Sequence, residues 1–264
     1  MSTPAEVWSY RTLITNLAQR DLKARYKRSV LGWLWSLLNP AATLGIYTLV
    51  FGVFLKGEAP GLAYGDRSVF ALYLFCGLVT WNVFQGVINT SIISFQSAGP
   101  LLTRTYFPPE APMVAGLITV MLQAVLEVGI LMFFMVILGN LSWTGLLLVP
   151  IFALAACMAF GLGLLLAVLN IRFRDVAYLT GILLQVWFYA TPIVYPLDII
   201  DGTARTFINA NPLTHFVYGV RQSVYTLETP TLANWAMMIG SAVVCLLVGW
   251  VVFSRLAPRV IEEL

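Results

Sequence analysis

The sequence predicts an all-α integral membrane protein, and three observations support this. Of its 264 residues, 59% are hydrophobic and only 10% are charged, whereas soluble domains carry about 25% charged residues. The mean hydropathy is +0.85. Uncharged stretches of membrane-spanning length recur along the chain. A water-soluble globular protein is close to excluded, and so is disorder, which requires low hydrophobicity. We expect one membrane-spanning domain over residues 1–264.

The uncharged stretches predict six membrane-spanning helices. A span needs about 20 mostly apolar residues, because the hydrocarbon core is about 30 Å thick and a helix rises about 1.5 Å per residue. The turn-forming sequence at 139–142 divides one long apolar stretch into the third and fourth spans. The predicted spans cover residues 30–55, 69–95, 112–138, 144–169, 176–195 and 233–254.

The basic residues predict the orientation of these spans. Six crossings place both termini on one side of the membrane. Eleven Lys and Arg residues then lie on the side of the termini and four on the other side. Because cytoplasmic segments are enriched in Lys and Arg, both termini are expected in the cytoplasm.

Residues 5–28, ahead of the first span, predict an amphipathic helix in the membrane surface. Its second half carries five cations in nine residues. One interpretation is that they only set the orientation and contact anionic lipids. The other is a site for a phosphate-bearing substrate or partner. The five inner-boundary cations are Arg20, Lys23, Arg25, Lys27 and Arg28.

Residues 96–111 predict a short cytoplasmic helix or turn closed by a stiff elbow. Proline lacks an amide donor and restricts the residue before it, and prolines occupy positions 100, 108, 109 and 112. A rigid protrusion on the cytoplasmic face is suited to receive force from a partner protein. The alternative is a loop without a partner.

The segment between the last two spans predicts two short outer helices. Two prolines in the sequence 191–196 stop the fifth span, and amphipathic pieces within 197–229 are broken at 209–212. Such pieces can re-enter the membrane only where protein or a water-filled cavity covers their backbone.

Glu127 is the one acidic residue well inside a predicted span. Burying an unpaired carboxylate there is costly, which makes a functional role one hypothesis. The alternatives are a structural hydrogen bond to Gln123 or to a neighbouring helix, and a neutral carboxyl whose pKa is raised.

Aromatic side chains lie at depths where a channel could run, and their faces suit sliding contact with sugar rings. Packing in the core or against lipid is an equally good interpretation for each of them. The candidates are Tyr47, Phe51, Trp81, Phe84, Trp187, Phe188 and Tyr189.

The sequence contains no phosphate-binding loop, since lysines occur only at positions 23, 27 and 56 and none follows a glycine. The single histidine excludes a histidine cluster for zinc. No set of side chains suggests catalysis. We expect this chain to bind no cofactor or metal and to have no enzymatic activity of its own.

Five sequence stretches, in this order, resemble the permease subunits of bacterial polysaccharide ABC exporters of the type-2 group. Together they cover about residues 10–225, and the first and fourth are fairly specific. Pro109 departs from the pattern, where a more variable and often basic residue is expected. The stretches are Arg20–Pro40, Phe107–Pro112, Arg172–Asp175, Thr191–Pro196 and Asn211–Phe216.

This resemblance implies a homodimer with two copies of a separate ATPase that binds ATP and Mg²⁺. It implies export of an undecaprenyl-diphosphate-linked polysaccharide, of the O-antigen, teichoic acid or galactan type, across the bacterial plasma membrane. It assigns 5–28 to an interface helix, 96–111 to ATPase coupling and 197–229 to outer gate helices, with the first and fifth spans lining the path.

The resemblance also assigns roles to individual residues. It implies no nucleic-acid partner. The coupling residues are Arg104, Phe107, Pro108 and Glu110. The outer-gate residues are Thr191, Pro192, Tyr195, Asn211, Pro212 and His215.

Three other function classes stay open at this point. The first keeps the exporter but makes its cargo a drug or small lipid. The second is an intramembrane glycosyl- or acyl-transferase, for which Asp198, Asp201 and His215 are the outer candidates. The third is an ion channel or secondary carrier, which would work without an ATPase.

Overall fold

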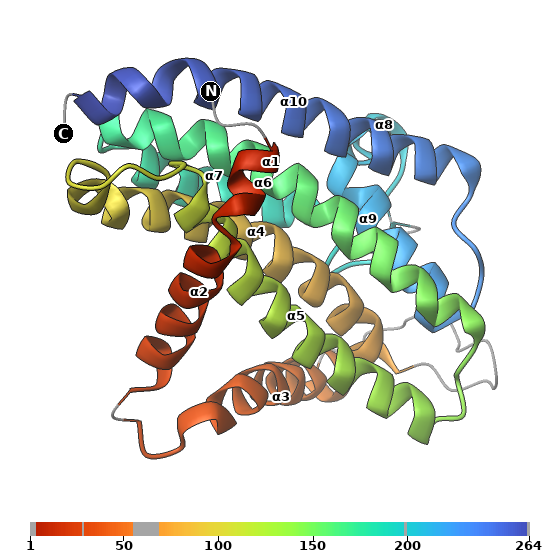
Figure 1. Cartoon of the computed structure of the whole chain (residues 1–264). Helices are drawn as coiled ribbons and strands as arrows, with labels where there is room; N and C mark the ends of the chain where they lie inside the picture. Colours follow the sequence, from red (N-terminus) through yellow and green to blue (C-terminus); the bar gives the residue numbers. More distant parts are fainter. Residues whose placement is uncertain (1–3, 28, 55–68, 198–199, 263–264) are drawn as a thin grey trace.

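The computed structural model describes residues 4–27, 29–54, 69–197 and 200–262, and this part of the chain is helical with no strand (Figure 1). Four helical segments are long and apolar enough to cross a membrane. They are α4 (Phe70–Leu102), α5 (Ala111–Ile137), α6 (Leu148–Arg172) with the 3-10 turn Trp143–Leu147 before it, and α10 (Leu232–Glu262). The predicted class of helical membrane protein is confirmed.

Helix α4 is the centre of the bundle. It packs against α5, α6 and the short helix α9 (Pro212–Arg221). Most of its apolar segment is buried, whereas most of the apolar segments of α5 and α10 is not. Its fully buried side chains include Phe75, Phe84 and Phe95. The apolar faces that α5 and α10 do not bury are the surfaces expected of a protein whose solvent is lipid.

Small residues allow the closest helix contacts. Gly161 on α6 and Gly249 on α10 face each other so closely that a Cβ on either would overlap the backbone of the other helix. Gly163 on α6 similarly leaves room for Ser91 on α4. Small residues at an interface let membrane helices approach closely, so these glycines set the spacing of α4, α6 and α10.

The N-terminal segment forms two helices where one was predicted over 5–28. They are α1 (Pro4–Ser9) and α2 (Arg11–Tyr26), and Tyr10 leaves helical geometry between them with ψ at 18°. Helix α2 packs across the start of α5. One face of the predicted surface helix is therefore covered by protein.

The first and fifth predicted spans contain shorter α-helices than expected. The first consists of a 3-10 turn (Gly32–Leu34), α3 (Trp35–Tyr47) and a π-helical stretch (Thr48–Phe54). The fifth is α7 (Val176–Tyr189), whose 14 residues extend about 21 Å at 1.5 Å per residue. Helix α7 ends before Pro192 because the chain turns there.

Residues 96–102 do not form a separate coupling helix, which differs from the prediction. Helix α4 continues through Pro100 to Leu102, and the turn at 103–110 then leads directly into α5. A proline in the last turn removes one hydrogen bond at a place where water can replace it. The proline-rich elbow itself is present.

The segment predicted to form two outer helices does so. Helix α8 (Gly202–Ala210) and α9 are separated at Asn211, and a π-helical turn (Gln222–Thr226) follows. Helix α10 then extends beyond the predicted end at residue 254.

We expect Gly249→Val to destabilise the protein by about 1–3 kcal/mol or more, because overpacking a close contact forces backbone shifts. The measurement is the thermal unfolding midpoint in detergent. Gly240→Val is the matched control, since a Cβ at Gly240 on the same helix meets nothing within 4 Å. Equal midpoints for the two variants would contradict the close packing of α6 and α10.

Candidate functional site

Helix α2 is held against the bundle by a small apolar cluster of its own. Ile14, Leu17 and Ala18 on α2 are buried against side chains from the elbow and from the start of α5. Those partners are Phe107, Ala111 and Ala115. The contact fixes the position of the cation-rich end of α2 relative to the end of α4.

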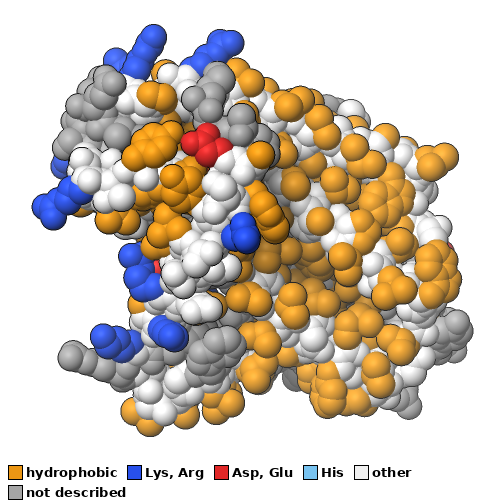
Figure 2. Space-filling model, in the orientation of Figure 1, with side chains coloured by type: hydrophobic (Ala, Val, Ile, Leu, Met, Phe, Trp, Pro, Cys, Tyr) orange, Lys and Arg blue, Asp and Glu red, His pale blue; other side chains and the backbone are white. Residues whose placement is uncertain are grey.

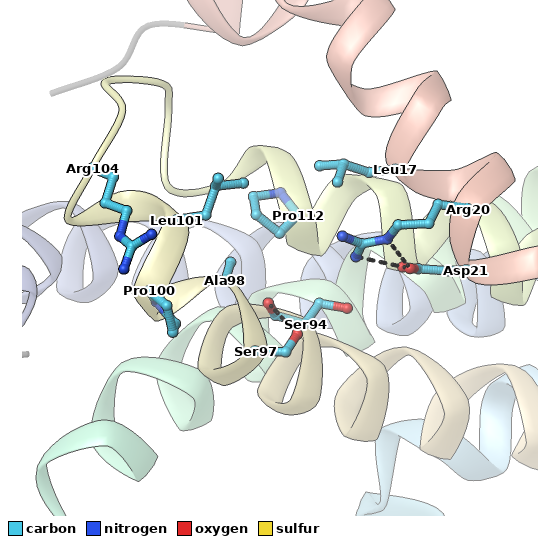
Figure 3. A pocket seen from close by; sticks show the side chains of 10 residues that line it. All are labelled: Leu17, Arg20, Asp21, Ser94, Ser97, Ala98, Pro100, Leu101, Arg104 and Pro112. Atoms are coloured by element: carbon cyan, nitrogen blue, oxygen red, sulfur yellow. Dashed lines mark hydrogen bonds and ion pairs between the residues drawn. The ribbon is translucent and has the colours of Figure 1, made fainter. Parts of the chain in front are cut away.

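A pocket of about 350 Å³ lies where α2, the end of α4 and the start of α5 meet. Arg20 from α2 and Arg104 from the turn after α4 lie at its two ends, and Ser94 and Ser97 line it between them (Figure 3). The Arg20 guanidinium also donates to Asp21 Oδ1 at 3.0 and 3.1 Å. That ion pair is exposed and therefore weak. The pocket presents donors and positive charge at the predicted cytoplasmic face.

The other predicted inner-boundary cations continue this surface. Lys23, Arg25 and Lys27 are exposed, while Arg28 lies outside the described residues. Figure 2 shows basic side chains gathered toward one end of the molecule, while the rest of the visible face is mostly hydrophobic. A contact with phosphate groups stays a prediction.

The predicted coupling residues divide into one exposed and three buried side chains. Arg104 is exposed in the turn, whereas Phe107, Pro108 and Glu110 are buried within their own chain. The buried three anchor the turn beside α2. Of the four residues, only Arg104 therefore presents an accessible side chain.

The turn also contacts α1 through an exposed pair. The Tyr106 hydroxyl donates to Glu6 Oε1 at 3.2 Å, and this hydrogen bond to the carboxylate raises the pKa of Tyr106 above its ordinary value. The pair joins the turn to the N-terminal helix, so α1, α2 and the turn form one surface.

The intramembrane acid Glu127 contacts side chains from two helices. Asn82 Nδ2 on α4 donates to Glu127 Oε2 at 3.0 Å, and Gln123 Nε2 on α5 lies 3.5 Å from Oε1. Gln123 Nε2 also donates to the Ser36 carbonyl on α3 at 3.0 Å. These contacts support the predicted structural hydrogen bonds and join three helices.

Four of the predicted channel aromatics pack against one another between α4 and α7. The ring centroids of Trp81 and Phe188 are 5.3 Å apart, and those of Phe84 and Trp187 are 5.1 Å apart, both edge-on. Such pairs stabilise helix contacts. Because Phe84 is fully buried, the structure supports the packing interpretation for it.

The remaining aromatic candidates differ in exposure. Tyr189 is 62% exposed at the end of α7, and Tyr47 is half-buried on α3. The Phe51 side chain lies outside the described part. Whether these aromatics line a path stays a prediction.

Two of the predicted outer-gate residues, Asn211 and Thr191, share one hydrogen-bond network. The Asn211 amide donates to Thr191 Oγ1 at 2.9 Å, and its oxygen accepts from Trp187 Nε1 at 2.9 Å and from the Leu213 amide at 3.1 Å. One side chain therefore caps α9, which begins with Pro212, and ties it to the end of α7.

Two other gate residues are held by hydrogen bonds nearby. The Tyr195 hydroxyl donates to the Tyr189 carbonyl at 2.8 Å. His215 Nδ1 lies 2.9 Å from Asn234 Oδ1, and its Nε2 lies 3.0 Å from the Asn209 carbonyl. The histidine thus links α8, α9 and the start of α10.

Arg221 is a residue that the sequence interpretation missed, having counted it only as an outer cation. Its side chain is 2% exposed and donates to the carbonyls of Tyr73, Pro192 and Ile193 at 3.2, 2.7 and 2.8 Å. Its guanidinium carbon lies 3.7 Å from the centroid of the Tyr73 ring, a cation–π contact.

These contacts tie α9 to α4 and to the turn after α7. Gly77 on α4 leaves room for the Arg221 guanidinium, since a Cβ there would lie 3.3 Å from it, a tight contact. A signal for this role was present in the sequence: Arg221 follows Val217 by four residues and therefore lies on the apolar face of its helix.

Comparison with known proteins finds one family and several proteins that are similar to this chain. Residues 12–225 match the family described as ABC-2 type transporter. The O-antigen export system permease protein RfbA of Myxococcus xanthus is 30% identical over 98% of both chains, and RfbA of Klebsiella pneumoniae is 27% identical over 96% of this chain and 95% of the relative. The polysialic acid transport protein KpsM of Escherichia coli is 25% identical over 86% of this chain and 88% of the relative.

We expect Arg221→Met to destabilise the protein by at least about 3 kcal/mol, because three buried carbonyls lose a charged donor. The thermal unfolding midpoint in detergent measures the effect. Arg205→Met, at an exposed position on α8, is the control and should change stability by less than about 0.5 kcal/mol. A similar, small effect of both substitutions would show that Arg221 does not hold α9 in place.

Proposed function

The chain belongs to the ABC-2 type transporter family, and from this premise we propose that it is the membrane-spanning permease subunit of a polysaccharide exporter. The observation that carries the proposal is end-to-end similarity to two kinds of glycan transport protein, the O-antigen and the polysialic acid systems. The chain is a multi-pass protein of the bacterial inner membrane. As a transporter subunit, it moves a substrate and does not transform it.

The proposed cargo is an undecaprenyl-diphosphate-linked polysaccharide that moves from the cytoplasm across the membrane. The exposed cations on α2 and the pocket between Arg20 and Arg104 support an anionic group at the inner boundary. A lipid diphosphate carries both the charge and the acceptor oxygens that guanidinium groups bind. The glycan would follow through the membrane after its lipid anchor is engaged.

The proposed topology has six crossings with both termini in the cytoplasm. In addition to the four long helices, α3 with its flanking turns and α7 would form the first and fifth crossings. The C-terminal ends of α4, α6 and α10 lie at one end of the bundle (Figure 1). Arg104, Arg172 and Arg255 are therefore found at the same end, as the positive-inside rule requires.

The proposed assembly is a homodimer with two copies of a separate ATPase that binds ATP and Mg²⁺. Helix α7 buries only Thr180 and Leu184 within its own chain. Its exposed face is large and apolar, and a second copy covering it would place the two α7 helices beside a shared path. The exposed face contains Tyr178, Leu179, Ile182, Leu183, Val186 and Tyr189.

The turn after α4 is the proposed contact with the ATPase. Arg104 and Tyr106 are exposed at its tip, while Phe107 is buried against α2. Because the exposed tip of the turn is attached to the buried Phe107, a displacement of the tip would move α4, α5 and α2 together. The ATPase would in this way act on the helices that border the inner cations.

We expect cells from which the chain is removed to lose the glycan from their surface and to accumulate it in the cytoplasm. Surface and total glycan are measured with a glycan-specific lectin or antibody before and after permeabilisation. The wild-type gene should restore display in these cells. Cells that have the chain but whose ATPase partner cannot hydrolyse ATP should lack display. Unchanged display, with altered drug sensitivity or lipid composition instead, would favour a drug or small-lipid exporter.

We expect Arg104→Glu to lower glycan export at least about tenfold, because reversing a charge at an interface costs several kcal/mol. Less ATPase should co-purify with this variant. Arg255→Glu is the matched control, as another exposed arginine at the same end of the bundle, and should leave both measurements near the wild-type level. Full export by the Arg104 variant would remove the turn from the ATPase contact.

A further inference from the structure

A second cavity, of about 470 Å³, lies between the C-terminal end of α2, helix α3 and the middle parts of α4 and α5. Its size is within the range of small-ligand pockets, about 300–1,000 Å³. We name it the amide–carboxylate cavity after the side chains that line it. Those that matter here are Arg25, Ser36, Asn39, Asn82, Gln123 and Glu127.

The cavity is polar although its helices are apolar. Asn82 is exposed well inside α4, between the buried residues Trp81 and Val83. An amide exposed to hydrocarbon at this depth would lose its hydrogen bonds to water. Lining a cavity that holds water or a polar ligand avoids this cost. A lipid tail is therefore a poor occupant.

The acid in the cavity has capacity for further hydrogen bonds. An ionised carboxylate has about four acceptor positions, and among the residues that the structure describes, Asn82 and Gln123 are the donors that reach Glu127. Glu127 lines the cavity and is 5% exposed, so it borders the cavity from a largely buried position. Donors on a ligand could occupy the remaining positions.

Charge selects among the classes of polar ligand. Glu127 disfavours an anion deep in the cavity, whereas Arg25 disfavours a cation that approaches past the end of α2. The remaining side chains are amides and hydroxyls, which both donate and accept. A neutral, hydroxyl-rich ligand matches this mixture.

The cavity also provides an apolar surface. Trp35, which lines it together with Pro40, is 43% exposed. A sugar ring has hydroxyls at its edge and C–H groups on its faces, so it can contact the indole and the amide–carboxylate cluster at once. Neither a free phosphate nor a hydrocarbon chain has both hydroxyls and C–H faces.

We propose that the amide–carboxylate cavity binds one neutral sugar unit of the exported glycan and selects it beside the middle of α4 and α5. Glu127, Asn82 and Gln123 pair with its hydroxyls, and Arg25 stays at the rim. The inference rests on the proposed function as a polysaccharide exporter and adds a substrate subsite to it.

The test is photo-crosslinking in cells that contain the full chain and its ATPase. A photoreactive phenylalanine derivative is introduced at Thr43, which lines the cavity. The control places it at Val125, which is 65% exposed and points away from Glu127 on α5. We expect crosslinked glycan at Thr43 and at least about tenfold less at Val125.

The role of the acid is tested in the same strain with Glu127→Gln. Losing a hydrogen bond to a charged group lowers binding roughly tenfold, so the yield at Thr43 should fall by about that factor while the ATPase co-purifies normally. If this variant does not accumulate, Asn82→Ala replaces it, because Asn82 is exposed and its loss leaves no large buried void. In the Asn82→Ala variant we expect the yield of crosslinked glycan at Thr43 to fall several-fold.

Equal yields at Thr43 and Val125, or a yield at Thr43 that neither substitution lowers, would overturn the inference. Glycan display measured in parallel separates the two proposals. If display requires the chain but Thr43 captures no glycan, the sugar subsite is wrong and the exporter stands. If display does not require the chain, the proposed function fails and the subsite fails with it.

Discussion

The structure depends on one constraint: lipid offers no hydrogen-bond partners, so each polar group inside the bundle must find one within the chain or in a polar cavity. Arg221 meets this with three carbonyl oxygens and the face of Tyr73. Asn140 is fully buried and donates to the carbonyls of Val224 and Tyr225, each at 2.9 Å. These contacts decide which helices are neighbours, because each polar side chain reaches a different segment of the chain.

The constraint also explains how the two ends of the molecule are held. At one end, apolar side chains of α2 pack against Phe107 and the start of α5, and they leave the cations exposed. At the other end, Asn211 and Arg221 hold α9 to the ends of α7 and α4. Helix α4 contributes to both regions and to the amide–carboxylate cavity between them. It is thus the physical connection from the pocket between Arg20 and Arg104 to α9.

Much of the architecture was predictable from the sequence because lipid imposes a strong pattern on composition. The third and fourth spans, 112–138 and 144–169, match α5 and α6 closely, and the break at Asn211 separates two helices as expected. Helix ends near prolines were harder to predict. Pro100 lies inside α4, while Pro192 follows the early end of α7, because tertiary contacts and access to water decide whether a proline is tolerated.

The sequence by itself determined the membrane class and the lack of a phosphate-binding loop, since composition and local spacing carry that information. The basic inner boundary and the outer gate stay predictions, the first from the positive-inside rule and the second from the family resemblance. Only the tertiary structure decided which polar residues meet. Ser36, Asn82 and Glu127 are far apart in the sequence and share one cavity, and Arg221 lies on Tyr73. Such partnerships depend on how α3, α4, α5 and α9 pack, and packing at a distance leaves no local pattern in the chain.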